Sequence, residues 1–329
     1  MYNQELTKGS EKLVKDMKDF HVDLTTAFAR NPQLSLSPDY RRKKANQFYL
    51  KHFGKIEEIA ETKEFMVRNI VDLHEIPVRL YKNHHEKSEN LLIYIRGGGW
   101  IQGNLDTHDY ICKKLAHYLN VDVLSVDYRL APEKVFPVQL NDVLSAYIWS
   151  YSELKYEHIM LAGDSGGGNL CAALCIKLAE KSEKIIAPEA QILFYPHLGN
   201  DFESTSFQVF ENCPALSKVA VVFFLSKYTG ISDMYDSMFC NNKLIYPLLE
   251  DDMTVFPKTI IISAGHDVLL DSQLEFAEKL RKSNREVYHI IDQGAVHGFM
   301  TFGKYFEDEV NKNCCRIRDF LHRTDQIFE

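Results

Sequence analysis

Residues 159–176, IMLAGDSGGGNLCAALCI, constrain the fold of this chain more than any other stretch of its sequence. A short apolar run leads into Gly-Asp-Ser-Gly-Gly, and apolar residues then recur at helical spacing. The pentapeptide fits G-x-S-x-G, which places Ser165 on a sharp turn between a strand and a helix and holds its hydroxyl clear of the sheet. Strand and helix come close at such a turn, so we expect Gly163 and Gly167 to lack side chains for steric reasons.

Strand-like and helix-like segments alternate along most of the chain. We expect strands near residues 65–67, 76–82, 91–95, 121–126, 159–161, 192–195, 259–263 and 287–291, and helices over residues 107–120, 138–154, 272–282 and 305–322. Strands separated by helices predict an α/β fold whose mostly parallel sheet is covered on both faces.

Two parts of the chain break this alternation. Residues 1–60 are charged and helix-like, with an amphipathic helix around residues 13–24 and a second helix at 40–52. The interval between Pro196 and Pro247 is too long for a loop, is rich in aromatic residues and contains a helix candidate at 217–228. We expect both parts to fold over the carboxyl ends of the strands.

Composition excludes several classes of function. The chain has 329 residues and a formal net charge of -8, which argues against a nucleic-acid-binding surface. Its longest apolar run, 219–225, is too short to span a bilayer. The amino terminus lacks an apolar segment of signal-peptide length, so we expect a cytoplasmic protein with no membrane partner. Seven cysteines without a C-x-x-C pair suggest neither a disulfide framework nor a zinc site.

Three consecutive glycines follow the strand predicted at 91–95, in the sequence Arg96-Gly97-Gly98-Gly99-Trp100. Their bare amide groups could bind an oxygen that becomes negatively charged in a transition state. A flexible turn is the alternative interpretation of such a run. The serine turn elsewhere in the chain favours the oxyanion-binding interpretation.

A serine nucleophile needs a base and an acid that orients the base. In this fold they should follow the serine in the order acid, then histidine, each in a loop after a late strand. Asp267 and His297 meet that requirement. The competing acid is Asp201, which follows an earlier strand, while Asp271 is expected to cap the next helix and His266 has the wrong order for the base.

Taken together, these motifs resemble the hormone-sensitive-lipase-like branch of the α/β-hydrolases, and within it the bacterial acetyl esterases and short-chain carboxylesterases. The resemblance covers the chain from about residue 64 onward. It rests on the segments RGGGW at 96–100, GNLDTHD at 103–109, DYRLAPE at 127–133, Phe136-Pro137 and GDSGGG at 163–168, and on the loops of Asp267 and His297.

The resemblance implies an eight-stranded core sheet with a helical cap. The cap would comprise the amino-terminal helices, residues 1–60, and an insertion, residues 198–246. The catalytic core would comprise residues 61–197 and 247–329.

The implied reaction is hydrolysis of a small ester with a short acyl chain, from acetyl to about hexanoyl, through an acyl-enzyme. Ser165 would attack the ester carbonyl, His297 would take the serine proton and Asp267 would hold the imidazole. The oxyanion hole would draw on the amide of Gly166 and on two of the amides of Gly97, Gly98 and Gly99. This chemistry needs no metal and no organic cofactor.

The chain departs from the family pattern at two positions. Arg96 stands where the family's oxyanion loop normally opens with histidine, and Gly166 stands where alanine is commoner. We hypothesise that Arg96 keeps the loop ordered and draws acidic groups toward the site.

Two alternative functions follow from the same residues. One is an amidase or formamidase that uses the same triad, and the other is a weakly catalytic small-molecule-binding protein. A membrane-acting lipase is disfavoured because the sequence shows no long exposed apolar segment.

Overall fold

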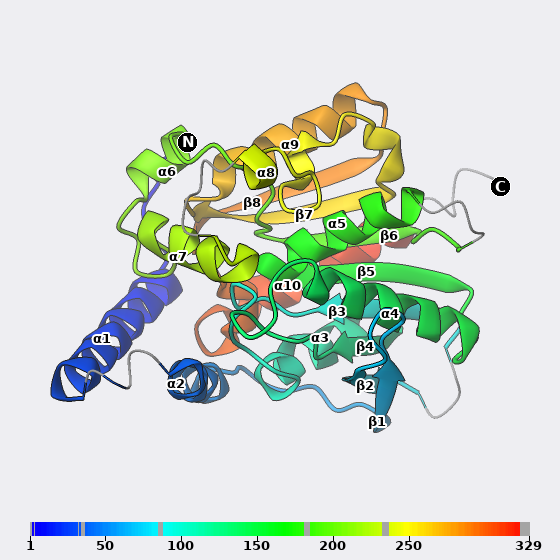
Figure 1. Cartoon of the computed structure of the whole chain (residues 1–329), viewed down its shortest axis with the longest axis horizontal. Helices are drawn as coiled ribbons and strands as arrows, with labels where there is room; N and C mark the ends of the chain where they lie inside the picture. The colour runs from blue at the N-terminus through cyan, green and yellow to red at the C-terminus, as the bar shows by residue number, and fades with distance from the viewer. Residues whose placement is uncertain are drawn as a thin grey trace.

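The computed structural model describes residues 2, 4–31, 33, 37–84, 88–180, 185–231 and 237–322. Within these residues, eight strands form one sheet in the order β1-β2-β4-β3-β5-β6-β7-β8 (Figure 1). The strands are β1 Glu61–Arg68, β2 Glu75–Lys82, β3 Asn90–Ile95, β4 Asp122–Val126, β5 His158–Asp164, β6 Ala190–Phe194, β7 Lys258–His266 and β8 Val287–Val296. Strand β2 runs antiparallel to both neighbours, and the other pairs are parallel. The predicted α/β class and the mostly parallel sheet are confirmed.

Ten α-helices lie within the described residues. They are α1 Lys8–Arg30, α2 Pro38–Lys51, α3 Asp109–Leu119, α4 Val138–Ser152, α5 Gly166–Ala179, α6 Thr205–Val209, α7 Lys218–Thr229, α8 Ser237–Cys240, α9 Leu270–Lys282 and α10 Gly303–His322. Short 3-10 helices occur at η2 Asp106–His108, η3 Pro247–Leu249, η4 Met253–Val255 and η5 Phe299–Thr301. No helix in the described part of the chain is long and apolar enough to cross a membrane.

Alternate residues of each strand point to opposite sides of the sheet. Both faces therefore carry apolar side chains, and helices bury them on each side. In β3, Leu91 and Ile93 pack into the core shared with α4, α5 and α9. Leu92 and Tyr94 pack into the other core, shared with α3 and α10. All four side chains are fully buried, and burial of each contributes about 2 kcal/mol. The apolar run that predicted this strand therefore serves two cores at once.

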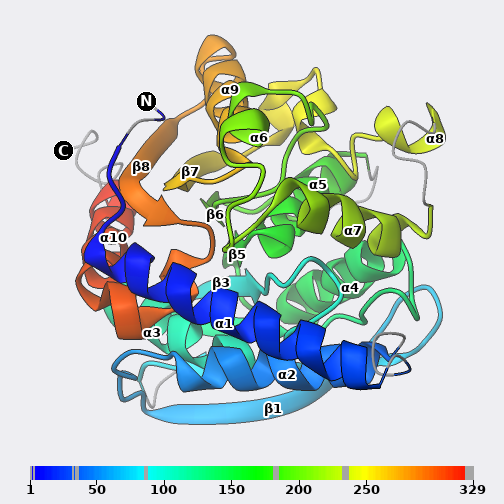
Figure 2. The same ribbon diagram turned by 90° about the vertical axis from the view of Figure 1, so that its left-hand side faces the viewer.

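The two parts that break the alternation lie near one end of the sheet. Helices α1 and α2 run side by side (Figure 2), and α7 lies above them in that view. Leu13 anchors α1 in the same core as α10, while Thr7, Ser37 and Ser217 accept hydrogen bonds that cap the amino termini of α1, α2 and α7. Side chains from all three helices border the cavity at Ser165.

The turn at Ser165 packs very closely against the end of β3. A Cβ atom added to Gly167 would lie 1.9 Å from the carbonyl oxygen of Ile95. A Cβ atom added to Gly163 would lie 2.6 Å from the backbone of Gly167 and 2.7 Å from the same Ile95 oxygen. The steric role predicted for the two glycines is therefore confirmed.

We expect Gly167→Ala to lower the free energy of unfolding by at least about 2 kcal/mol, because the added methyl must displace backbone. The urea midpoint of the purified variant measures this change. Lys177→Ala, near the far end of the same helix, is the matched control and should shift the free energy by no more than about 0.5 kcal/mol. A parent-like midpoint for Gly167→Ala would contradict the close approach.

Candidate active site

Ser165 occupies the turn between β5 and α5 in a strained backbone conformation. Its φ is 53° and its ψ is -119°, a region that residues with a side chain rarely adopt. The Ser165 amide donates to the carbonyl of Phe194 on the neighbouring strand, at 2.9 Å. The turn is therefore fixed from the side of β6, and it holds the serine at the carboxyl end of β5.

His297 and Asp267 directly follow the last residues of β8 and β7. The Nε2 atom of His297 lies 2.9 Å from the Ser165 hydroxyl oxygen, and its Nδ1 atom lies 2.6 Å from a carboxylate oxygen of Asp267. The other Asp267 oxygen accepts from the Leu269 amide at 3.0 Å. Asp267 is fully buried and His297 is 8% exposed. The structure thus brings all three predicted residues into one hydrogen-bonded chain.

The competing residues lie elsewhere. Asp201 is exposed and accepts from the amide of Glu203. His266 packs against the ring of Phe210 at 5.2 Å between centroids. The prediction that Asp271 caps a helix is wrong, because α9 already begins at Leu270, and the Asp271 carboxylate instead accepts from the Ser206 amide at 2.8 Å.

The loop after β3 turns its amides in two directions. The Gly97 amide donates to a carboxylate oxygen of Asp164 at 2.8 Å, so Gly97 is not one of the two loop amides that can serve an oxyanion hole. Within the described residues, the amides of Gly98, Gly99 and Gly166 donate to no protein acceptor. Gly98 and Gly99 have φ values of 103° and 58°, which glycine tolerates without strain. Gly166 and two of the three candidate loop amides are therefore available to a substrate oxygen.

Asp164 ties this loop to the serine turn, a role that sequence reasoning missed. Its carboxylate accepts from the Tyr94 hydroxyl at 2.7 Å as well as from Gly97, and it lies 3.4 Å from Nε2 of His108. Burial alone would raise the pKa of Asp164, but His108 and the hydrogen bonds from Tyr94 and Gly97 together lower it. The available signal was the position of this acid, directly before the serine.

Arg96 is almost fully buried beneath the loop and is held on several sides. Its guanidinium donates to the carboxylate of Asp127 at 2.9 Å, to the carbonyl of Tyr128 at 2.8 Å and to the carbonyl of Gln102 at 3.2 Å. It also lies over the Tyr128 ring, 4.1 Å from the centroid. These contacts support the hypothesis that Arg96 orders the loop. They contradict its second half, because the Arg96 charge is 1% exposed and paired with Asp127.

A cavity of about 150 Å³ opens beside Ser165 and His297. Its walls come from the loop after β3, from α1 and α2, and from α7 with the segment before it. The ring of Phe224 on α7 packs against Gly99, where a Cβ atom would lie 2.5 Å from it. Phe20 and Phe48 border this cavity on one side and a more open cavity of about 570 Å³ between α1 and α2 on the other.

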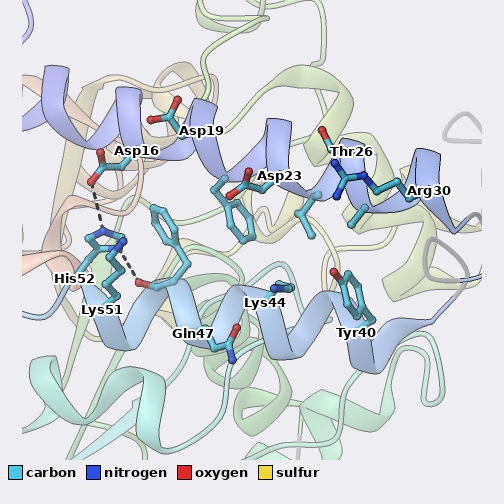
Figure 3. Close-up of a pocket in the computed structure, with 14 residues that line it drawn as sticks. Asp16, Asp19, Asp23, Thr26, Arg30, Tyr40, Lys44, Gln47, Lys51 and His52 are labelled. Carbon is cyan, nitrogen blue, oxygen red and sulfur yellow. Dashed lines mark hydrogen bonds and ion pairs between the residues drawn. The ribbon is translucent and has the colours of Figure 1, made fainter.

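The cavity between α1 and α2 carries charges of both signs. Asp23 on α1 and Lys44 on α2 both line it (Figure 3). At one end, Asp16 lies 3.4 Å from the ring of His52. Among the residues that the structure describes, no group of three or more histidine, cysteine or acidic side chains is arranged to hold a metal ion.

His197 is a buried histidine that the sequence did not single out. It is 3% exposed, its ring lies 5.6 Å from that of Trp100, and its amide donates to the Ser165 carbonyl. Neither ring nitrogen has a hydrogen-bond partner within the described residues. Burial therefore lowers the pKa of His197 to about 4, so the ring stays neutral near neutral pH.

Comparison with known proteins places the chain in a family. A family model described as the alpha/beta hydrolase fold matches residues 92–301. Carboxylic ester hydrolase LipN of Mycobacterium tuberculosis is 32% identical over 234 residues, which span 69% of this chain and 61% of LipN. Arylacetamide deacetylase of Bos taurus is 32% identical over 293 residues, which span 70% of this chain and 73% of that protein. The solved structure of ester-hydrolase EH1AB1 from the metagenome of Lake Arreo has a TM-score of 0.81 and 26% identity, with 95% of this chain and 98% of that chain covered.

The chain therefore belongs to the α/β-hydrolases, in the hormone-sensitive-lipase-like family. That family is one of carboxylic ester hydrolases, so the resemblance inferred from the sequence motifs is confirmed.

The buried His197 makes stability depend on pH. The unfolded chain takes up a proton at His197 as the pH falls through about 6.5, whereas the folded protein does so only near a pKa of about 4. Proton uptake then favours unfolding, so His197 lowers the free energy of unfolding progressively between these two values, by up to about 1.4 kcal/mol per pH unit.

We expect His197→Gln to flatten the fall in unfolding free energy between pH 6.5 and 4.5, as measured by urea titration at several pH values. His74→Gln, at an exposed position, is the control and should keep the slope of the parent protein. Equal slopes for His197→Gln and the parent would contradict a buried, neutral His197.

Proposed function

We propose that this protein hydrolyses carboxylic esters of short acyl chain, from acetyl to about hexanoyl, with Ser165, His297 and Asp267 as its catalytic triad. The observation that carries the proposal is the hydrogen-bonded chain from Ser165 through His297 to Asp267, beside amides that have no acceptor among the described residues. Two of the proteins described above, carboxylic ester hydrolase LipN and ester-hydrolase EH1AB1, support an ester substrate by their printed names.

The reaction begins with the proton of Ser165. His297 Nε2 accepts this proton as the serine oxygen bonds to the ester carbonyl carbon, and Asp267 keeps the Nδ1 proton in place and stabilises the imidazolium. The tetrahedral intermediate collapses, and His297 returns the proton to the departing alcohol. Water, deprotonated by the same histidine, then attacks the acyl-enzyme and releases the acid and the free serine.

The amides of Gly98, Gly99 and Gly166 stabilise the negative oxygen of the intermediate. Each such donor is worth about 3 kcal/mol when it is aimed at the oxyanion in advance. The Asp164 carboxylate and the Arg96 guanidinium act as positioning groups, since they hold the backbone that carries these amides. The loop therefore needs little reorganisation when charge develops.

The short-chain preference rests on the size of the cavity. Its volume of about 150 Å³ is below the roughly 300 Å³ at which pockets for drug-sized ligands begin. We assign its closure to a cap formed by residues 1–60 and 198–246, and the catalytic core to residues 61–197 and 247–329. Helices α1, α2 and α7 contribute side chains to the cavity, which supports this division.

We expect hydrolysis of 4-nitrophenyl esters, from acetate to palmitate, to peak at hexanoate or shorter and to fall roughly 10⁴-fold or more in Ser165→Ala. Release of 4-nitrophenolate measures the rate, and matched circular dichroism checks that the variant is folded. No release above the variant at any chain length would overturn ester hydrolysis at Ser165. A peak at long chains would overturn only the short-chain assignment.

Amide hydrolysis by the same triad is the second candidate, favoured by the similarity to arylacetamide deacetylase. The comparison of 4-nitroacetanilide with 4-nitrophenyl acetate separates the two. If the protein is an ester hydrolase, kcat/KM should be much higher on 4-nitrophenyl acetate than on 4-nitroacetanilide. Comparable values on the two substrates would identify the protein as an amidase. A chain that binds these compounds without turnover would correspond to the weakly catalytic alternative.

Phe224 should limit the length of the acyl chain, because its ring packs against Gly99 at the wall of the cavity. We expect Phe224→Ala to raise the ratio of kcat/KM on octanoate to that on butyrate by roughly tenfold. Val219→Ala on the same helix, at a side chain that is 76% exposed, should keep the ratio of the parent protein. An unchanged ratio in Phe224→Ala would remove this residue from the acyl-binding wall.

A further inference from the structure

Trp100 links the two segments whose amides form the proposed oxyanion hole. It directly follows Gly99 in the loop after β3, and its indole lies against Gly166 at the start of α5. A Cβ atom added to Gly166 would lie 3.0 Å from the nearest indole carbon and 3.2 Å from the indole nitrogen. Trp100 is therefore joined to one source of amides through the chain and to the other by packing.

The backbone of Trp100 is strained. Its φ is 60°, a left-handed conformation that is costly for a residue with a bulky side chain. Gly98 and Gly99, directly before it, also have positive φ values, so the loop turns tightly here. Such a conformation persists only where surrounding contacts impose it. The contacts of Trp100 therefore help to decide where the two glycine amides point.

Tyr228 on α7 stacks on the indole of Trp100. The two ring centroids lie 4.3 Å apart, and the ring planes are 9° from parallel. The ring of His197 meets the same indole edge-on, with the centroids 5.6 Å apart. Trp100 and Tyr228 are both buried, so the indole cannot shift without breaking this packing.

One loop anchors the backbone of both stacked residues. The Ala131 amide donates to the Trp100 carbonyl at 3.0 Å, and the Phe136 amide donates to the Tyr228 carbonyl at 2.8 Å. The Phe136 ring also meets the Tyr228 ring at 5.7 Å between centroids and 72° from parallel. The loop between β4 and α4 therefore fixes the end of α7 relative to Trp100.

We propose that Tyr228 is a positioning residue for the oxyanion hole, which acts by holding the Trp100 indole in place between the loop and Gly166. The inference rests on the proposed ester hydrolysis and adds a residue of α7 to the groups that support its transition state. It also links the two substitutions that can disturb the hole. A methyl group at position 166 presses on the indole, and the stack with Tyr228 resists the shift that would relieve this contact.

Two variants of Tyr228 separate the ring from the hydroxyl. We expect Tyr228→Leu to lower kcat and kcat/KM for 4-nitrophenyl butyrate by the same factor, roughly tenfold, because the amides act mainly on the transition state. The Tyr228 hydroxyl has no hydrogen-bond partner among the described residues. Tyr228→Phe keeps the stacking ring and should restore kcat to within about twofold of the parent value.

Phe256→Leu is the matched control for lost packing. Phe256 is fully buried like Tyr228, and its ring meets that of Phe276 with the centroids 4.9 Å apart. It precedes the amino end of β7, whereas Asp267 follows the carboxyl end of that strand. Phe256→Leu should lower the urea midpoint to a similar extent as Tyr228→Leu but keep the kcat and kcat/KM of the parent protein.

Gly166→Ala tests the coupling through the indole. In the parent protein the added methyl should lower kcat roughly fivefold, because it displaces groups that hold the oxyanion amides. In the Tyr228→Leu protein the indole can shift, so the same methyl should lower kcat by less than about twofold. If the leucine variant does not fold, Tyr228→Met takes its place, since methionine fills irregular gaps.

The outcomes separate this inference from the proposed function. An unchanged kcat in Tyr228→Leu, an equal loss in Phe256→Leu, or an equal effect of Gly166→Ala in both backgrounds would overturn the role of Tyr228. A pH profile of kcat/KM that differs between Tyr228→Leu and the parent would assign the loss to the triad and would also overturn it. If the parent protein does not hydrolyse the ester at all, the proposed function itself fails.

Discussion

The close packing of the serine turn against the end of β3 governs the geometry of the whole site. Gly163 and Gly167 leave room only for hydrogen atoms next to the Ile95 carbonyl, so α5 begins directly against the neighbouring strand. This contact brings Ser165 beside the loop that carries Gly98 and Gly99. The strained φ of 53° at Ser165 is maintained because the Phe194 carbonyl accepts its amide and the core surrounds β5.

Buried charges hold the loop in register with that turn, and each of them has partners. Asp164 accepts from Gly97 and Tyr94, while Arg96 pairs with Asp127 and donates to the Tyr128 carbonyl. An unpaired charge in this interior would cost several kcal/mol, so these contacts must form together as the loop orders. A permanently charged arginine therefore serves here as a brace for backbone, at the position where the family usually carries histidine.

Much of the fold could be predicted because its signals are local. Apolar runs and period-two alternation located the eight strands, although β1 begins four residues before its predicted start and β8 ends five residues after its predicted end. The glycines around Ser165 marked a turn that other residues could not make. Their order along the chain singled out Ser165, Asp267 and His297, and they meet because parallel strands bring their carboxyl ends to one edge. The helical cap is still a proposal, although α1, α2 and α7 do border the cavity.

The sequence by itself determined the fold class and the position of the turn, because hydrophobic periodicity and steric limits act between near neighbours. It also indicated which three side chains could form a triad, because each of them follows a predicted strand in the expected order. Only the tertiary structure decided which amides are left for an oxyanion. Gly97 and Gly98 are adjacent and chemically identical, and they differ only because the carboxylate of Asp164, 67 residues away in the chain, accepts from one of them. The pairing of Arg96 with Asp127 likewise depends on a contact between distant segments, which spacing along the chain does not encode.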